Sequence, residues 1–378
     1  MWFRYSRLSL RALSIIRPLK KTLVNILKFL LFLGIGLGIL YLVYQSQNTA
    51  YQEECALKGI PGTDCSLFQK VLTDFQEANY FWVLLVLVAF MISNVSRAIR
   101  WNMLIRPMGY APRFINSFLT TVLGYFANLG LPRMGEVVRG ASLSQYERIP
   151  LEKVMGTIVV DRIIDVISIL LVTGLVFLLE FETIWQFINE KADLGRLANL
   201  GNMMAIAAAA GGLGMGVIYL FRKPLSRTKI YKKVRDLALG FWEGLQTVRQ
   251  LDRPLWFLFH SVNIWFMYYL MTYLCFFAFA PTAGLPAVAA LTVFVFGGWG
   301  VVIPSPGGMG TYHFLAQTAL AMYGISGEDG FSWANIAFFS IQLGCNVLVG
   351  VLALVFLPIL NRGYHPGDTN EPVVTAKA

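Results

Sequence analysis

Charged residues are scarce in this sequence. Asp, Glu, Lys and Arg make up 14% of its 378 residues, whereas hydrophobic residues make up 56%. Soluble domains usually carry about a quarter of charged residues. The composition therefore excludes an ordinary soluble domain and indicates a protein embedded in a membrane.

The sequence patterns of many enzymes and of nucleic-acid-binding proteins are also missing. The chain has no Gly-x-x-x-x-Gly-Lys-Ser/Thr loop, no metal-ligand cluster, no Ser/His/Asp set and no RNA or DNA motif. Hence no catalytic residue, metal, cofactor or nucleic-acid partner is predicted. The net charge of +10 instead indicates attraction to anionic lipids at the inner membrane surface.

Cysteine is rare, with four residues in the chain. Cys55 and Cys65 are ten positions apart in a segment that the charge pattern places outside the cell, where an oxidising compartment favours a disulfide. Two free thiols are the alternative. Cys275 and Cys345 lie within apolar stretches and are expected to be packing residues.

Long apolar stretches predict the fold class. A helix needs about 20 residues to cross a bilayer, and six stretches predict full crossings: residues 26–44, 80–98, 157–179, 203–221, 255–280 and 333–357. Two further stretches, residues 114–131 and 286–323, are interrupted by Gly and Pro and predict re-entrant hairpins. We therefore expect an all-α polytopic membrane protein with a transmembrane domain over residues 26–360.

The first crossing has an alternative interpretation. Basic residues 1–25 precede an apolar stretch, as in a cleaved signal peptide, but no clear small-x-small cleavage site follows Tyr44. An uncleaved anchor is preferred. Residues 361–378 form a short polar tail.

Basic residues set the predicted orientation. Seven Lys or Arg residues lie before or at the start of the first crossing, and nine lie in residues 222–253, whereas the segment 45–79 holds two against five acids. The positive-inside rule places both termini and the basic loop 222–254 in the cytoplasm and the loop 45–79 outside. The predicted location is the plasma membrane.

The order of crossings and hairpins resembles an inverted repeat. Residues 80–179 predict a crossing, a cytoplasm-facing hairpin and a crossing, and residues 255–357 predict the same series with an outward-facing hairpin. The crossing 203–221 inverts the second unit. Sequence similarity between the units is slight, so chance is the alternative.

The first hairpin carries charged residues. After Gly130 and Pro132, the chain places Arg133, Glu136 and Arg139 at intervals of three, on one side of a predicted helix. Free N–H groups at the start of a helix and arginine side chains both attract anions, so we predict a phosphate-binding site. The alternative is an interfacial helix whose arginines touch phospholipid head groups nonspecifically.

A second group of charges opens the third crossing. Asp161 and Asp165 are four residues apart on one helical face, and Arg162 is three from Asp165, so an intramembrane ion pair is predicted. Placement at the membrane boundary is the alternative. Arg97 and Arg100 are expected to be ordinary cytoplasmic anchors.

The second hairpin has a different chemistry, because no Lys or Arg occurs between Arg253 and Arg362. Its turn offers backbone amides and hydroxyl groups, which predict a neutral anion-binding turn or gate. His313 is expected either to titrate or to be a fixed hydrogen-bond partner. The predicted gate residues are Pro304, Pro306, Gly307, Gly308, Gly310 and His313.

At these same residues the chain resembles the flippase-like transmembrane region of lysylphosphatidylglycerol synthases and related uncharacterised membrane proteins. The resemblance covers roughly residues 81–357 and rests on three motifs in order: Leu-Pro-Arg-Met-Gly-Glu-Val-Val-Arg at 131–139, Asp-Arg-Ile-Ile-Asp at 161–165 and Pro-Ser-Pro-Gly-Gly-Met-Gly at 304–310. It implies a polytopic protein that moves lipids between leaflets. The family's polar positions are matched by Arg133, Glu136, Arg139, Arg162 and Asp165.

Two residues depart from the family pattern. Asp161 stands where the family commonly has Glu, and His313 stands near a position that is often Glu. The synthase activity is not carried over, because that chemistry belongs to a soluble aminoacyltransferase domain and only a short tail follows the last crossing.

The sequence thus favours a lipid flippase or transporter whose substrate is an anionic phospholipid or lipid-linked intermediate. Arg133, Glu136, Arg139, Asp161, Arg162 and Asp165 are its predicted substrate-binding residues. One rival is a membrane-embedded lipid-modifying transferase. The other is a non-transporting partner of an envelope-assembly complex, and a homo-oligomer is a further option.

Overall fold

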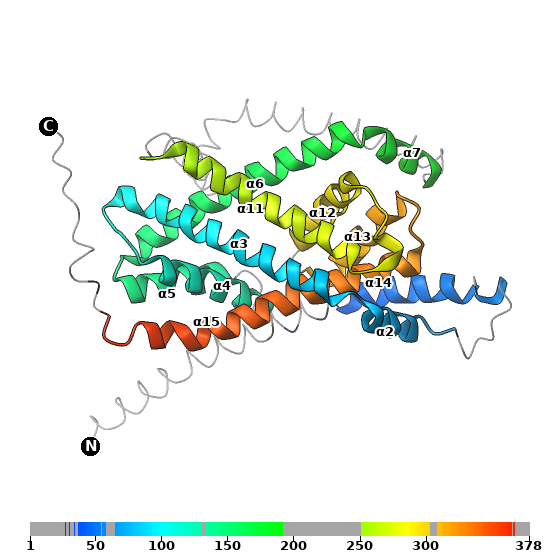
Figure 1. The fold of residues 1–378 in the computed structure, drawn as a ribbon, viewed down its shortest axis with the longest axis horizontal. Helices are drawn as coiled ribbons and strands as arrows, with labels where there is room; N and C mark the ends of the chain where they lie inside the picture. The colour runs from blue at the N-terminus through cyan, green and yellow to red at the C-terminus, as the bar shows by residue number, and fades with distance from the viewer. Residues whose placement is uncertain are drawn as a thin grey trace, which may run out of the picture.

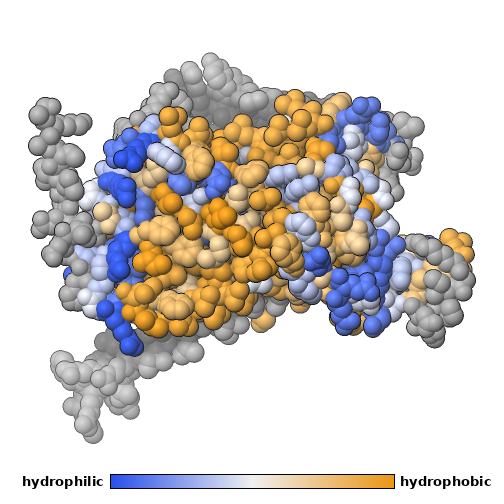
Figure 2. Space-filling model, in the orientation of Figure 1, coloured by the Kyte–Doolittle hydropathy of each residue, from blue (hydrophilic) through white to orange (hydrophobic). Residues whose placement is uncertain are grey.

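The computed structural model describes residues 37–53, 55–57, 65–130, 134–191, 251–302, 308–364 and 366, together with 27, 30 and 34. The regular secondary structure of these residues is entirely helical, with no strand. A broad apolar band separates two hydrophilic ends of the molecule (Figure 2). Three helical stretches are long and apolar enough to cross a bilayer, namely Tyr80–Met108, Leu151–Leu179 and Gly327–Leu360. The predicted all-α polytopic fold class is confirmed.

The first structural unit is a hairpin between two long helices (Figure 1). Its helices are α3 (Tyr80–Ile105), α4 (Phe114–Gly130), α5 (Gly135–Glu147) and α6 (Leu151–Leu179), with a short 3-10 helix, Arg106–Met108, after α3. The 17 residues of α4 span only about 25 Å at 1.5 Å per residue, which is shorter than the hydrocarbon core. The chain therefore turns back at Gly130, and α5 packs against α4.

The second unit repeats this arrangement. It contains α11 (Pro254–Phe277), a 3-10 turn (Ala280–Thr282), α12 (Ala287–Val302) and α13 (Thr311–Ala321), followed by one long helix. That last helix comprises α14 (Gly327–Ala337), a π-helix (Phe338–Cys345) and α15 (Asn346–Leu360). The hairpin α12–α13 enters from the end of the molecule opposite to the hairpin α4–α5 (Figure 1).

The two units run in opposite directions. Helices α3 and α11 pack along each other, and the N–H of Asn79 before α3 donates to the carbonyl of Ala278 after α11. The two helices are therefore antiparallel. This is the geometry expected of an inverted-topology repeat.

Some predicted boundaries change. Helix α3 continues to Ile105, seven residues beyond the predicted end, and the predicted loop 45–79 contains helical residues 45–53 and α2 (Leu67–Glu77). Helix α11 has 24 residues but is not among the three stretches named above, because Tyr, Trp, His and Asn interrupt its apolar sequence. The predicted crossing 203–221 and the basic loop 222–254 lie outside the described residues, except for positions 251–254.

Two links fix the hydrophilic end that carries α2 and α7 (Phe181–Lys191). Cys55 and Cys65 form a disulfide with Cα atoms 6.3 Å apart. Lys70 Nζ lies 2.7 Å from Asp329 Oδ1, which ties α2 to α14, and 2.9 Å from Asp74 Oδ2. Burial lowers the pKa of Lys70, but the hydrogen bonds to Asp329 and Asp74 outweigh burial and raise it above its ordinary value.

Candidate functional site

A cluster of buried charges joins α3 to α6. Arg97 Nη1 lies 3.2 Å from Asp161 Oδ2 and 2.8 Å from Asp165 Oδ2. Arg100 Nη2 lies 2.5 Å from Asp161 Oδ1 and 2.7 Å from Asp165 Oδ1. Each arginine therefore bridges both carboxylates, and all four side chains are buried.

Arg139 adds α5 to the cluster. Its Nη1 lies 3.1 Å from Asp161 Oδ2, and its guanidinium carbon lies 3.8 Å from the ring centroid of Trp101. The Trp101 ring N–H in turn donates to Thr157 Oγ1 of α6 at 2.9 Å. Cation–π contact and the ion pair together fix the position of Arg139.

The cluster carries an excess of positive charge. Three buried guanidinium groups, those of Arg97, Arg100 and Arg139, face two buried carboxylates. Buried Nε atoms of all three arginines, and Nη2 of Arg139, have no hydrogen-bond partner. Buried charges are tolerated when they are paired and hydrogen-bonded, so this part of the membrane domain is suited to a neighbouring anionic group.

The expectation that Arg97 and Arg100 are cytoplasmic anchors is wrong. Both side chains are buried at the centre of the cluster, because α3 continues past them and packs against α6. The sequence does indicate this burial, because polar residues recur three or four positions apart along the otherwise apolar α3 and so lie on one face of the helix. These buried polar residues are Ser93, Asn94, Ser96, Arg97, Arg100 and Asn102.

Arg162 and Glu136 form a more accessible pair beside the cluster. Arg162 Nε lies 2.7 Å from Glu136 Oε1, and Arg162 Nη1 lies 3.4 Å from Asp165 Oδ2. The side chains of Arg162 and Glu136 are 37% and 40% exposed, whereas that of Arg139 is 3% exposed. A ligand can therefore reach Arg162 directly, whereas the Arg139 guanidinium group is buried against Asp161 and Trp101.

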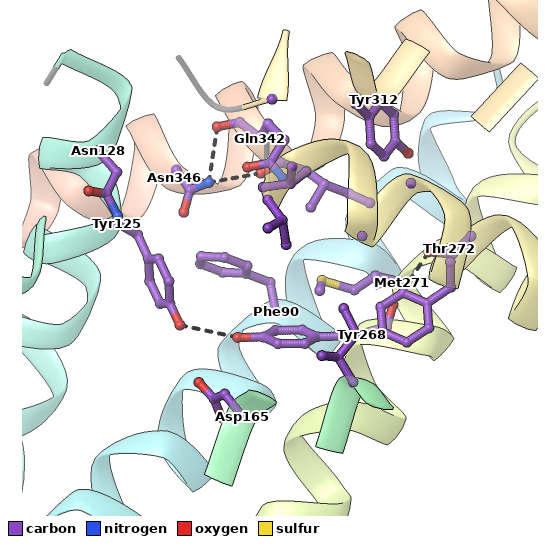
Figure 3. Close-up of a pocket in the computed structure, with 18 of the residues that line it drawn as sticks. Phe90, Tyr125, Asn128, Asp165, Tyr268, Met271, Thr272, Tyr312, Gln342 and Asn346 are labelled. Atoms are coloured by element: carbon purple, nitrogen blue, oxygen red, sulfur yellow. Dashed lines mark hydrogen bonds between the residues drawn. The ribbon is translucent and has the colours of Figure 1, made fainter. Parts of the chain in front are cut away.

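A cavity of about 510 Å³ lies next to these charges. Arg97, Glu136, Arg162 and Asp165 line one end. Most of the rest is apolar or aromatic, which is typical of pockets that bind small molecules. Tyr125 and Tyr268 meet in the cavity wall with their hydroxyl oxygens 3.1 Å apart (Figure 3).

Two residues that line the cavity are exposed at mid-depth of the apolar band. Among its lining residues, Val166 of α6 and Val302 of α12 are more than half exposed. Val166 lies near the middle of the 29-residue helix α6, and Val302 ends α12 at the inner tip of the second hairpin. Arg162 is one helical turn from Val166 and thus lies close to this exposed surface.

The second hairpin supplies the far wall of the cavity. Gly308 and Tyr312 line it, together with Gly297 and Gly298 of α12. Gly308 has φ +82° and Gly310 has φ +83°, a left-handed conformation that glycine adopts without strain. Thr311 Oγ1 donates to the carbonyl of Gly300 at 2.6 Å and holds the two helices of the hairpin together.

His313 caps α13. The N–H of Gly310 donates to His313 Nδ1 at 3.3 Å, and the ring is buried. This contact matches the expected role of a fixed hydrogen-bond partner. Nothing in the described part of the chain places His313 in the cavity lining, so any role in gating is exerted through the turn at Gly308 and Gly310.

The structure thus brings four predicted residues together, Glu136, Asp161, Arg162 and Asp165, with Arg139 behind them. Arg133 and the predicted gate residues Pro304, Pro306 and Gly307 lie outside the described residues. The predicted helix start at Pro132 is also outside them, and α5 begins at Gly135.

The fold and the site define an integral membrane protein with two opposed hairpins, a buried charge cluster and a central cavity. The chain belongs to the family described as the lysylphosphatidylglycerol synthase transmembrane region, whose model matches residues 55–360. The match contains both hairpins and the whole charge cluster.

One curated relative is similar over part of its length. It is a UPF0104 membrane protein of Methanocaldococcus jannaschii, 30% identical over 132 residues, which cover 32% of this chain and 39% of that protein. The chain thus matches about two fifths of that relative. No solved structure matches the chain.

Proposed function

We propose that this protein is a lipid transporter of the plasma membrane that moves an amphiphile with an anionic, phosphate-bearing head group between leaflets. Membership of a membrane family named for a lipid synthase supports a lipid-related role. The observation that carries the proposal is the cavity of about 510 Å³ between two opposed hairpins, lined by charged residues at one end and by exposed apolar residues of α6 and α12.

Arg162 is the proposed phosphate ligand. It is the most accessible cation among the described residues of the cavity, and its guanidinium group is already oriented by Glu136 and Asp165. A phosphate that enters the cavity competes with Glu136 for the positive charge of this guanidinium group. Bidentate hydrogen bonding of a phosphate oxygen pair suits a guanidinium better than an ammonium.

The other charged residues have a positioning role in this proposal. Arg139 and Arg100 hold Asp161, and Arg97 holds Asp165, which keeps Arg162 at the cavity wall. Acyl chains remain in lipid beside the exposed side chains of Val166 and Val302. The turn that contains Gly308 and Gly310 acts as the gate on the outer side.

The test is leaflet exchange in proteoliposomes. Fluorescently labelled phosphatidylglycerol is followed by dithionite quenching, with and without an imposed proton gradient. Loss of a charge-assisted contact costs about 1.5 to 3 kcal/mol, so Arg162→Gln should slow exchange at least tenfold, and Arg162→Lys should restore part of the rate.

Arg106→Gln is the matched control, because Arg106 is exposed at the end of α3 and does not line the cavity. Equal rates for Arg162→Gln and the parent protein would refute the phosphate site. Production of a new lipid without transfer between leaflets would instead favour a membrane-embedded transferase.

A further inference from the structure

The end of the cavity away from the charge cluster is lined by neutral amides. Asn128 of α4, Gln342 of the π-helix and Asn346 of α15 line it. Figure 3 shows these three side chains together, with Asp165 on the other side of the Tyr125–Tyr268 pair. Among the described residues that line the cavity, the cations are Arg97 and Arg162, and both belong to the charged end.

One of these amides is buried with unsatisfied hydrogen-bonding capacity. Asn346 is 7% exposed, and its Nδ2 donates to the backbone carbonyls of Gln342 at 3.0 Å and Ile341 at 3.4 Å. Its Oδ1 is buried and has no hydrogen-bond partner. Buried polar atoms are normally satisfied by protein, water or a ligand, so this oxygen is an unused acceptor in the wall that Asn346 contributes to the cavity.

The π-helix explains why polar groups are present here. A π-turn widens the helix, frees backbone carbonyls and is frequent at functional sites. Asn346 satisfies two of these carbonyls, and the widened turn places Gln342 in the cavity wall. Asn128 lines the cavity from α4 of the first hairpin. Its Oδ1 accepts a hydrogen bond from the N–H of Gly135 at 2.8 Å, which leaves its amide nitrogen for a ligand.

We propose that this amide end binds hydroxyl groups, so that the transported head group is a phosphate joined to a polyol or sugar. The inference rests on the proposed transport of a phosphate-bearing lipid. Asn and Gln amides both donate and accept, as hydroxyl groups do, whereas no cation among the described lining residues would meet a second phosphate there. Tyr125, Tyr268 and Phe90 between the two ends offer apolar surfaces of a kind suited to the C–H face of such a group.

Direct binding of four short-chain probes to the full-length protein in lipid nanodiscs tests this proposal. Dioctanoyl phosphatidic acid and dioctanoyl phosphatidylglycerol differ by a glycerol group, and citronellyl phosphate and citronellyl phosphomannose differ by a sugar. In at least one pair, the hydroxyl-bearing probe should have a Kd at least fivefold lower than its partner. The preferred pair identifies a glycerophosphate or a glycosyl phosphate as the source of the hydroxyl groups.

Gln342→Met tests the amide end, because it removes the amide at nearly constant length and Gln342 does not brace the π-helix through its side chain. It should abolish the preference while changing the Kd of the phosphate-only probe less than twofold. Gln317→Met is the control, since Gln317 is a buried amide of α13 outside the cavity lining. It should leave the preference intact.

The two proposals fail in different ways. Equal affinity within both pairs, or a preference that survives Gln342→Met, would overturn the hydroxyl site and indicate that the amides hold water. Arg162→Gln should weaken all four probes, and unchanged binding in that variant would overturn the phosphate site. Failure of all four probes to bind the parent protein would overturn both.

Discussion

The buried arginines and aspartates act as one unit at the scale of single residues. Arg97 and Arg100 each contact both Asp161 and Asp165, whereas Arg139 is paired with Asp161 alone. Removal of Asp161 therefore takes one carboxylate from Arg97 and Arg100 and leaves Arg139 without its ion-pair partner. Breaking a buried pair costs far more than the intact pair contributes, because the remaining charge stays desolvated.

Asp161→Asn should therefore destabilise the protein by about 3 to 5 kcal/mol, measured as thermal or denaturant-induced unfolding in detergent. Asp252→Asn is the control, since Asp252 is exposed before α11. Adding Arg139→Gln to Asp161→Asn should recover part of the loss, because it restores the charge excess of the parent cluster. Equal stability of Asp161→Asn and the control would contradict the shared cluster.

The charged site was only partly predictable from the sequence. The spacing of Asp161 and Asp165 places both carboxylates on one helical face, and a charge within a crossing indicates a protein interior. Hydropathy places Arg97 and Arg100 at the membrane surface, because they stand near the end of an apolar stretch. Their burial depends on the packing of α3 against α6, which hydropathy does not report.

At the scale of elements, the two hairpins depend on close helix contact. A Cβ at Gly135 would overlap the carbonyl oxygen of Gly124 and come within 2.7 Å of the Asn128 side chain. At Gly300, a Cβ would come within 2.8 Å of the Tyr312 backbone. Small residues let helix backbones approach where lipid provides no hydrophobic driving force.

Gly135→Ala should separate α5 from α4 and destabilise the protein by about 1 to 3 kcal/mol, the usual cost of overpacking. Gly156→Ala in α6 is the matched control, because nothing lies within 4 Å of its added Cβ. It should be neutral or stabilising by about 0.5 to 1 kcal/mol through higher helix propensity. A lower unfolding temperature for Gly135→Ala than for Gly156→Ala would support the close contact between α4 and α5. Equal unfolding temperatures would contradict it.

The hairpins could be predicted from the sequence, whereas the π-helix could not. Gly130 with Pro132 and the Pro304 to Gly310 motif interrupt apolar stretches, and a helix of 16 or 17 residues is too short to cross. No comparable motif in the sequence indicates the π-turn at Phe338–Cys345. It lies within a continuous apolar helix, and its effect appears only where Gln342 and Asn346 meet the cavity.

At the scale of the whole molecule, the inverted repeat places two unlike hairpin tips at one cavity. The first hairpin brings Glu136 and the second brings Gly308 and Tyr312, from opposite ends of the apolar band. Such a site can in principle be exposed to either leaflet by movement of one unit against the other. This arrangement requires that the base of one hairpin be cytoplasmic and the base of the other external.

Opposite labelling of two introduced cysteines would test this orientation. Glu77 is exposed at the end of α2, and Glu152 is exposed at the start of α6. The native cysteines give little background, since Cys55 and Cys65 are bridged and Cys275 and Cys345 are buried. By the positive-inside rule, a membrane-impermeant maleimide should label Glu77→Cys in intact cells and Glu152→Cys only after permeabilisation. Labelling of Glu152→Cys in intact cells would reverse the orientation, and labelling of both variants there would exclude a membrane-spanning path between α2 and α6.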